Sequence, residues 1–219
     1  MKQSFEIRVC PNPSCGLRYP LMDGQPFGTR CPHCLGETRA IIKQEIGDEI
    51  IREKFKREGL KVAVLLDNIR SAWNVGSILR SADGFGFVHA FLCGITPTPE
   101  QYAVKKTSLG AEEYVKWSYH KDAVKLVEEL KLDSWNIFAL EEGERAIPIS
   151  QIPDAHCTQP VVMIVGSELT GVDPGVLELA DEIYSIPMRG QKRSFNVAVA
   201  FGIAGFSISS KNTSRTLEG

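Results

Sequence analysis

Apolar residues in the last three quarters of the chain fall into short continuous runs separated by helical patterns. Such runs are typical of strands buried on both faces, and they cover Val62–Leu66, Phe87–Cys93, Trp135–Leu140 and Gln159–Val165, with a possible short strand at Tyr114–Trp117. The patterns between them predict helices over Val75–Ala82, Lys121–Leu132 and Pro174–Ala180. Alternating strands and helices predict an α/β domain with a largely parallel sheet.

The stretch Ile183–Phe206 combines a short strand, a basic loop and an uncharged helix. Pro187 ends the strand because it has no N–H for the ladder, and Ser194 is a natural N-cap. The apolar run Phe195–Ile208 is shorter than the ~20 residues that span a bilayer, so it predicts a buried helix and no membrane segment. One flank of this helix packs on its own sheet, and the other needs a second apolar surface. We therefore predict a homodimer built on this helix.

Two cysteine pairs lie near the N-terminus. Cys10 and Cys15 form the first pair, and Cys31 and Cys34 form the second. Thiolates on two tight turns converge on one tetrahedral ion, so the spacing predicts structural Zn²⁺, with disulfides or free thiols as the alternative. His33 is interpreted as a bystander, because four sulfurs already complete a tetrahedron.

The sequence predicts four parts of the chain, and its net charge bears on whether it binds RNA. The predicted parts are a zinc-ribbon module (1–44), a helical linker (45–60), an α/β domain (61–210) and a flexible tail (211–219). The formal net charge of −2 gives no whole-chain argument for nucleic acid, so an RNA-binding surface has to be a local patch. A small positive surplus in the cysteine module is compatible with RNA phosphates or with an ordinary solvated surface. Without a signal-peptide pattern, the protein is expected in the cytoplasm, where thiols stay reduced.

Polar residues follow several of the predicted strands, where ligands of open α/β sheets bind. They include Asn74 and Arg80 after the first strand, Glu141 and Glu142 after Leu140, Glu168 after Val165, and the basic loop before Ser194. No G-x-G-x-x-G sequence follows a strand, which argues against a nicotinamide enzyme.

Three sequence blocks resemble the motifs of SpoU/TrmH-like RNA 2′-O-ribose methyltransferases, of the trefoil-knotted SPOUT class. The blocks are NVGSILR at Asn74–Arg80, VGSELTG at Val165–Gly171, and IPMRG at Ile186–Gly190 followed by SFNVAV at Ser194–Val199. Their order, spacing and strand–loop context agree with that family from Lys61 to about Ser210. The resemblance implies a knotted, largely parallel-sheet SPOUT domain.

The resemblance also implies S-adenosylmethionine as methyl donor and a ribose 2′-hydroxyl of tRNA or rRNA as acceptor. It implies active-site roles for Asn74, Arg80, Glu168, Ser194 and Asn196, and cofactor contacts from Leu140, Gly166, Ile186, Met188 and Phe195. The family usually has Leu at the position of Phe195, so one wall of the cofactor pocket differs here. The family's dimer brings Arg80 of one chain near Ser194 and Asn196 of the other.

Two of these assignments have plainer alternatives. Arg80 is interpreted as a clamp on an RNA phosphate, because arginine stays protonated and is a poor base; a surface ion pair is the alternative. Glu168 also fits an ordinary carboxylate at a helix start. For the whole chain, the alternatives are a catalytically silent RNA-binding protein with a retained knot, and a zinc-ribbon module on an unrelated α/β enzyme.

Overall fold

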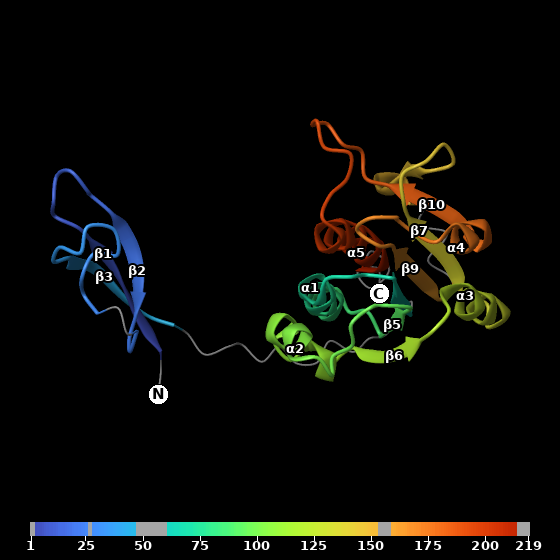
Figure 1. Cartoon of the computed structure of the whole chain (residues 1–219), viewed down its shortest axis with the longest axis horizontal. Helices are drawn as coiled ribbons and strands as arrows, with labels where there is room; N and C mark the ends of the chain where they lie inside the picture. Colours follow the sequence, from blue (N-terminus) through green and yellow to red (C-terminus); the bar gives the residue numbers. More distant parts are fainter. Residues whose placement is uncertain (1–2, 26–27, 47–60, 153–158, 214–219) are drawn as a thin grey trace. The chain divides into compact units, whose positions relative to one another are not determined.

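The computed structural model describes residues 3–25, 28–46, 61–152 and 159–213 of the chain. The chain divides into two compact units, residues 1–56 and 57–219 (Figure 1). The linker helix predicted over 45–60 lies outside the described residues, apart from its first two positions. Residues 214–219 of the predicted tail lie outside them as well.

The N-terminal unit is a three-stranded antiparallel sheet. Strand β1 (Ser4–Val9) lies between β2 (Arg18–Met22) and β3 (Arg39–Glu45). The guanidinium of Arg8, buried in this small unit, donates to the Thr38 hydroxyl over 2.8 Å and to the Thr38 carbonyl over 2.6 Å. These two bonds connect the central strand to the segment that follows the second cysteine pair, and so help to hold the cysteine turns beside the sheet.

The second unit is built on a seven-stranded sheet in the order β6-β5-β4-β9-β7-β10-β8. All six neighbouring pairs are parallel. The strands are β4 (Val62–Asp67), β5 (His89–Cys93), β6 (Lys116–His120), β7 (Asn136–Leu140), β8 (Ile147–Pro148), β9 (Val161–Val165) and β10 (Glu182–Ser185). The predicted parallel α/β domain is confirmed, and its central strands are the predicted apolar runs.

Helices cover both faces of this sheet (Figure 1). They are α1 (Ala72–Gly84), α2 (Tyr102–Ser108), α3 (Ala123–Leu132), α4 (Pro174–Leu179) and α5 (Val197–Thr213), with 3-10 turns at Ala111–Glu113 and Ile149–Gln151. Side chains of β4 alternate between the two layers: Val64 packs with α1, α2 and α5, and Leu65 packs with α3 and α4. Both faces of β4 are therefore buried, which explains its uninterrupted apolar sequence. In the described residues, no helix is long and apolar enough to cross a membrane.

Two helices differ from the sequence-based prediction. Helix α1 begins at Ala72, three residues before the predicted start at Val75, because Ser71 caps it and accepts from Asn74 N–H over 3.4 Å. Helix α2 was not predicted at all. It is seven residues long, and its N-cap Gln101 makes no side-chain capping bond, so it lacks the usual start signal.

The prediction of Ser194 as N-cap of the last helix is wrong. Helix α5 begins at Val197, and Oδ1 of Asn196 accepts from Ala198 N–H over 2.9 Å. Asparagine and serine cap equally well, so residue type alone does not choose between them. The helix also continues to Thr213, past the predicted end.

Candidate active site

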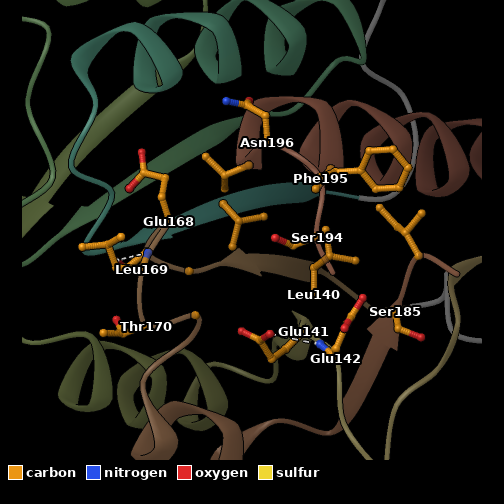
Figure 2. Close-up of a pocket in the computed structure, with 17 residues that line it drawn as sticks. Leu140, Glu141, Glu142, Glu168, Leu169, Thr170, Ser185, Ser194, Phe195 and Asn196 are labelled. Atoms are coloured by element: carbon orange, nitrogen blue, oxygen red, sulfur yellow. Dashed lines mark hydrogen bonds between the residues drawn. The ribbon is translucent and has the colours of Figure 1, made fainter. Parts of the chain in front are cut away.

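A cavity of about 600 Å³ opens at the carboxyl ends of β7, β9 and β10 (Figure 2). Its wall is completed by the segment that leads into α5. The lining residues are Leu140–Glu142 after β7, Val165–Gly171 after β9, Ser185 and Ile186 at the end of β10, and Ser194–Val197 with Ala200 at the start of α5. The volume lies in the range of about 300–1,000 Å³ that is usual for small-molecule sites.

The segment after β9 turns tightly at the cavity wall. Ser167 and Gly171 exchange backbone hydrogen bonds of 3.0 and 2.9 Å. A Cβ on Gly166 would lie 2.2 Å from the Gly171 carbonyl carbon and from Val172 N, so only glycine fits there. Gly171 has a φ of +73°, the left-handed region that favours glycine. The glycines of this motif are therefore explained by the turn itself, which presents backbone to the cavity.

Three carboxylates line the cavity: Glu141, Glu142 and Glu168. Glu141 holds the turn from outside, because its Oε2 accepts from Val172 N–H over 2.8 Å. Among the described residues that line the cavity there is no lysine or arginine. The wall is therefore a region of negative charge.

Glu168 connects the β9 turn to the start of α1. Its carboxylate accepts from the backbone N–H groups of Arg70 and Ser71, at 2.9 and 3.2 Å, and from the Asn74 side-chain amide at 2.7 Å. Burial raises the pKa of Glu168, but the hydrogen bonds, first that from Arg70 N–H, lower it more, so the net pKa lies below its ordinary value. Glu168 is therefore a carboxylate at neutral pH. Its carboxylate lies at the start of α1, as in the alternative of an ordinary helix-start carboxylate. It also binds Asn74, one of the predicted active-site residues.

Asn74 and Asn196 are joined across the two helix starts. Nδ2 of Asn196 donates to Oδ1 of Asn74 over 3.1 Å. Asn74 in turn donates to Glu168, so the three side chains form one chain of hydrogen bonds. The structure thus brings together three of the five predicted active-site residues.

Ser194 and Phe195 lie on the segment between the basic loop and α5, and both line the cavity (Figure 2). Phe195 is 40% exposed. Of the other predicted cofactor contacts, Leu140, Gly166 and Ile186 line the same cavity.

Three predicted site residues are not among the described residues that line the cavity: Asn74, Arg80 and Met188. Asn74 is connected to the wall through its hydrogen bond to Glu168, which lines the cavity. Arg80 is exposed, about 9 Å along the axis of α1 from Asn74 at 1.5 Å per residue. Within one chain, Arg80 therefore belongs to a different turn of α1 from Asn74 and is not part of the described cavity wall. Conversely, Glu141 and Glu142, noted in the sequence only as polar residues after a strand, line the cavity. Ser185, the last residue of β10, lines it as well and was not predicted.

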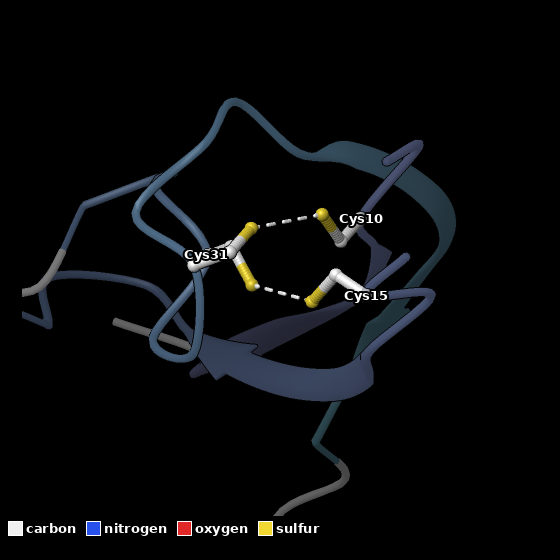
Figure 3. Close-up of side chains that lie close together, drawn as sticks. Cys10, Cys15 and Cys31 are labelled. Carbon is white, nitrogen blue, oxygen red and sulfur yellow. Dashed lines mark hydrogen bonds between the residues drawn. The ribbon is translucent and has the colours of Figure 1, made fainter. Parts of the chain in front are cut away.

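The four cysteines of the N-terminal unit converge. Their sulfurs all lie within 4.8 Å of one another, with Cys10 and Cys34 at 3.4 Å and Cys15 and Cys31 at 3.7 Å (Figure 3). A tetrahedron with Zn–S bonds of ~2.3 Å separates its sulfurs by about 3.8 Å, so the cluster has the right size. Nδ1 of His33 lies 3.4 Å from Cys15 Sγ, outside the four-sulfur set but in contact with it.

Comparison with known proteins gives the family. The sequence profile of the SpoU rRNA Methylase family matches residues 61–206, about two thirds of the chain. The chain belongs to this family. The match covers the whole seven-stranded unit as far as the middle of α5, including every segment that lines the cavity.

Relatives that are named as methyltransferases match a similar share of the chain. The chain is 30% identical over 156 residues to a tRNA (guanosine(18)-2′-O)-methyltransferase of Thermus thermophilus. The aligned residues cover 71% of this chain and 78% of the relative. It is 29% identical to the enzyme of the same name from Escherichia coli, over 68% of this chain and 63% of the relative.

Solved SpoU structures agree in fold. The A. aeolicus TrmH/SpoU tRNA modifying enzyme matches with a TM-score of 0.65 at 25% identity, over 72% of this chain and 78% of that one. The SpoU methyltransferase AviRb from Streptomyces viridochromogenes, solved with AdoMet, matches with a TM-score of 0.64 at 21% identity, over 84% and 70% of the two chains.

Proposed function

We propose that this protein is an S-adenosylmethionine-dependent methyltransferase that modifies a ribose 2′-hydroxyl of tRNA or rRNA. The observation that carries the proposal is the convergence of motif segments. The blocks that begin at Asn74, Val165, Ile186 and Ser194 are far apart in sequence, yet all contribute to one cavity or to the hydrogen-bond chain at its rim. The relatives named as tRNA 2′-O-methyltransferases support this activity.

The cavity suits the proposed cofactor in shape and charge. S-adenosylmethionine supplies an electrophilic methyl group on a cationic sulfonium. Apolar contacts from Leu140, Ile186 and Phe195 are assigned to its adenosine, with Gly166 allowing close approach to the backbone. The carboxylates of the wall attract the cationic sulfonium of the cofactor more than the neutral sulfur that remains after methyl transfer. The demethylated product is therefore bound less tightly and is released more easily. Met188 is assigned to the same site only through its place in the motif.

The substrate side is assigned to the hydrogen-bond chain and Ser194. Asn196, Asn74 and Glu168 fix one another at the cavity rim, so their amide and carboxylate groups are pre-oriented for a ribose. In-line transfer depends mainly on such positioning. Arg80 is assigned as a clamp on an RNA phosphate, contributed by the second chain of a homodimer.

The cysteine cluster is proposed to hold one structural Zn²⁺. Four thiolates close the tetrahedron and leave no open position for water, so the ion does no chemistry. The contact from His33 is that of an outer residue that orients a ligand sulfur. The unit around the ion, over residues 1–44, is proposed as an RNA-contacting zinc ribbon, followed by a linker over 45–60, the methyltransferase domain over 61–210 and a tail over 211–219.

Three further properties are proposed, the first two on the family resemblance. They are a trefoil knot in the seven-stranded unit, a homodimer, and a cytoplasmic location. The exposed apolar side chains of α5 support the dimer: Val199 is 51% exposed and Phe206 is 63% exposed in the single chain.

Methyl transfer itself is the test. The full-length protein is incubated with methyl-labelled S-adenosylmethionine and, separately, with tRNA and rRNA from cells that lack this gene. Label in RNA that resists alkaline hydrolysis at one linkage identifies a 2′-O-methyl group. RNA binding without label in either RNA would support the catalytically silent alternative.

A further inference from the structure

Trp73 is an exposed tryptophan directly beside the active site. It precedes Asn74 in the first turn of α1, and 59% of its surface is exposed. Tryptophan usually buries most of its ring, because the ring carries a large apolar area. An indole left in water next to a residue that binds Glu168 and Asn196 therefore needs an explanation.

A lysine lies over this indole. Nζ of Lys106, on α2, is 5.7 Å from the ring centroid of Trp73, a cation–π contact. The outer face of α2 carries Tyr102 and Lys106 one turn apart, and Leu109 caps the end of the helix; Tyr102 is 77% exposed and Leu109 is 67% exposed. Helix α2 also contains Lys105 and no acidic residue. Aromatic and cationic groups thus alternate on one exposed surface.

The platform has a rigid support. A Cβ on Gly76 would lie 2.6 Å from the Val104 carbonyl and 1.9 Å from Thr107 Oγ1, so α1 and α2 pack in close contact. At the other side of Trp73, Glu168 holds the backbone of the segment that enters α1. The backbone that carries the indole is therefore held at a fixed place beside Asn74.

We propose that Trp73 is a stacking platform for an unpaired nucleobase next to the methylated nucleotide, and that Lys106 binds the RNA backbone there. Stacking on an aromatic ring accepts any base, and a neighbouring ammonium neutralises phosphate, which is how single-stranded RNA is commonly held. The surface continues from the active site and carries positive charge, which fits RNA. The proposal rests on the proposed function, because it names a contact of that substrate.

Fluorescence and binding measurements on the full-length protein test the platform. Poly(A) quenches the wild-type tryptophan fluorescence, and Trp73→Phe removes that quenching while keeping part of the affinity. Trp73→Ala weakens poly(A) binding by about 5- to 100-fold, the range for loss of one stacked base. Binding of polyphosphate, which has no bases, stays unchanged in Trp73→Ala.

Lysine variants test the backbone contact. Lys106→Ala lowers the slope of log affinity for poly(A) against log salt by about 0.7, the value for one phosphate on a single strand. Lys125→Ala is the matched control, because Lys125 is 77% exposed on α3, on the opposite layer of the sheet, and it leaves the slope unchanged. In methylation assays, Trp73→Ala raises the KM for tRNA and leaves the Kd for S-adenosylmethionine unchanged.

The two proposals fail differently. A wild-type protein that methylates neither tRNA nor rRNA overturns the proposed function, while poly(A) quenching is measured independently of turnover. Wild-type affinity of Trp73→Ala for poly(A) overturns the platform. Conversion of a dimer to a monomer by Trp73→Ala, measured by light scattering, also overturns it, because Trp73 then belongs to a contact between chains.

Discussion

Asn196 donates a hydrogen bond to Asn74 over 3.1 Å, although 122 residues separate them in the sequence. The bond joins the N-cap of α5 to the first turn of α1. Since Asn74 also donates to Glu168 over 2.7 Å, three loops at the sheet edge are held in one arrangement. A chain of this kind orients groups at the cavity rim without filling the cavity itself.

The first prediction is that Asn74→Ala lowers methyl transfer about 100-fold, the scale of a small misplacement in an active site. The substitution removes the link between Glu168 and Asn196. The Kd for S-adenosylmethionine should change little, because Asn74 is not part of the cavity wall. Single-turnover methylation and calorimetric cofactor binding give the two values. Equal losses in both would place Asn74 on the cofactor side instead.

The buried central strands of the parallel sheet were readable from the sequence, whereas the short edge strand β8, the three strands of the N-terminal unit and the contacts of the site were not. Runs such as Val161–Val165 are apolar because both faces are buried, and burial of that kind is visible in the residues. Helix α2 was missed because seven residues without a capping bond give no periodic signal. The bond between Asn74 and Asn196 depends on two helices meeting in space, which the motif spacing does not encode.

The second prediction concerns Glu168 and pH. Its pKa is lowered below the ordinary 4.5 in the folded chain. A carboxylate whose pKa is lowered by folding stabilises the folded chain at every pH above its pKa in the unfolded chain. This stabilisation is lost as the pH falls through its pKa in the folded chain. Glu168→Gln should therefore cost about 0.5–1 kcal/mol near neutral pH, the lower range for loss of a helix cap at a solvent-exposed site.

Thermal unfolding of the wild type and Glu168→Gln over a pH series measures this difference. It should be constant above pH about 5 and shrink as the pH falls below about 4.5, because the Glu168 carboxylate of the unfolded chain then takes up a proton before that of the folded chain does. A difference that is the same at acid and neutral pH would show that the carboxylate charge is not what stabilises the start of α1.

The third prediction concerns Gly166. Gly166→Ala places a methyl group 2.2 Å from the Gly171 carbonyl carbon, so the turn has to shift. We expect a loss of about 1–3 kcal/mol in stability, as for other overpacked sites, together with weaker cofactor binding. Gly84→Ala is the matched control, because a Cβ there meets nothing within 4 Å; it should be neutral or stabilising in α1. Unchanged cofactor affinity in Gly166→Ala would mean that this turn does not shape the binding site.

The fourth prediction is that Cys31→Ser loses the zinc ion and unfolds the N-terminal unit. Metal binding by a small thiolate site contributes directly to folding free energy. The affinity of the second unit for S-adenosylmethionine should remain, since all the described residues that line the cavity belong to the second unit. His33→Ala should keep the ion with an affinity about 10-fold lower, the effect of losing an outer hydrogen bond. Metal analysis and circular dichroism measure both, and a Cys31→Ser protein with its full metal content would contradict the site.

The last prediction is a homodimer with shared active sites. Val199, Gly202, Ile203 and Phe206 follow helical spacing on α5, and their apolar stripe is open in the single chain: Val199 and Phe206 are exposed, and a Cβ on Gly202 meets nothing within 4 Å. A second copy of the same stripe fits such a surface, because a twofold axis brings identical patches together. Arg80, remote from the cavity of its own chain, would then serve the site of the other chain.

Mixing two inactive variants tests this arrangement. Arg80→Ala removes the clamp from one chain, and Asn196→Ala disables the rim of the other, so about half of the exchanged molecules are heterodimers with one intact site. Part of the activity should therefore return on mixing, and light scattering should show a dimer at micromolar concentration. Phe206→Glu, which places a charge in the stripe, should shift the protein to monomers and abolish transfer while leaving each chain folded. A fully active monomer, or no recovery despite proven subunit exchange, would show that each chain carries a complete site.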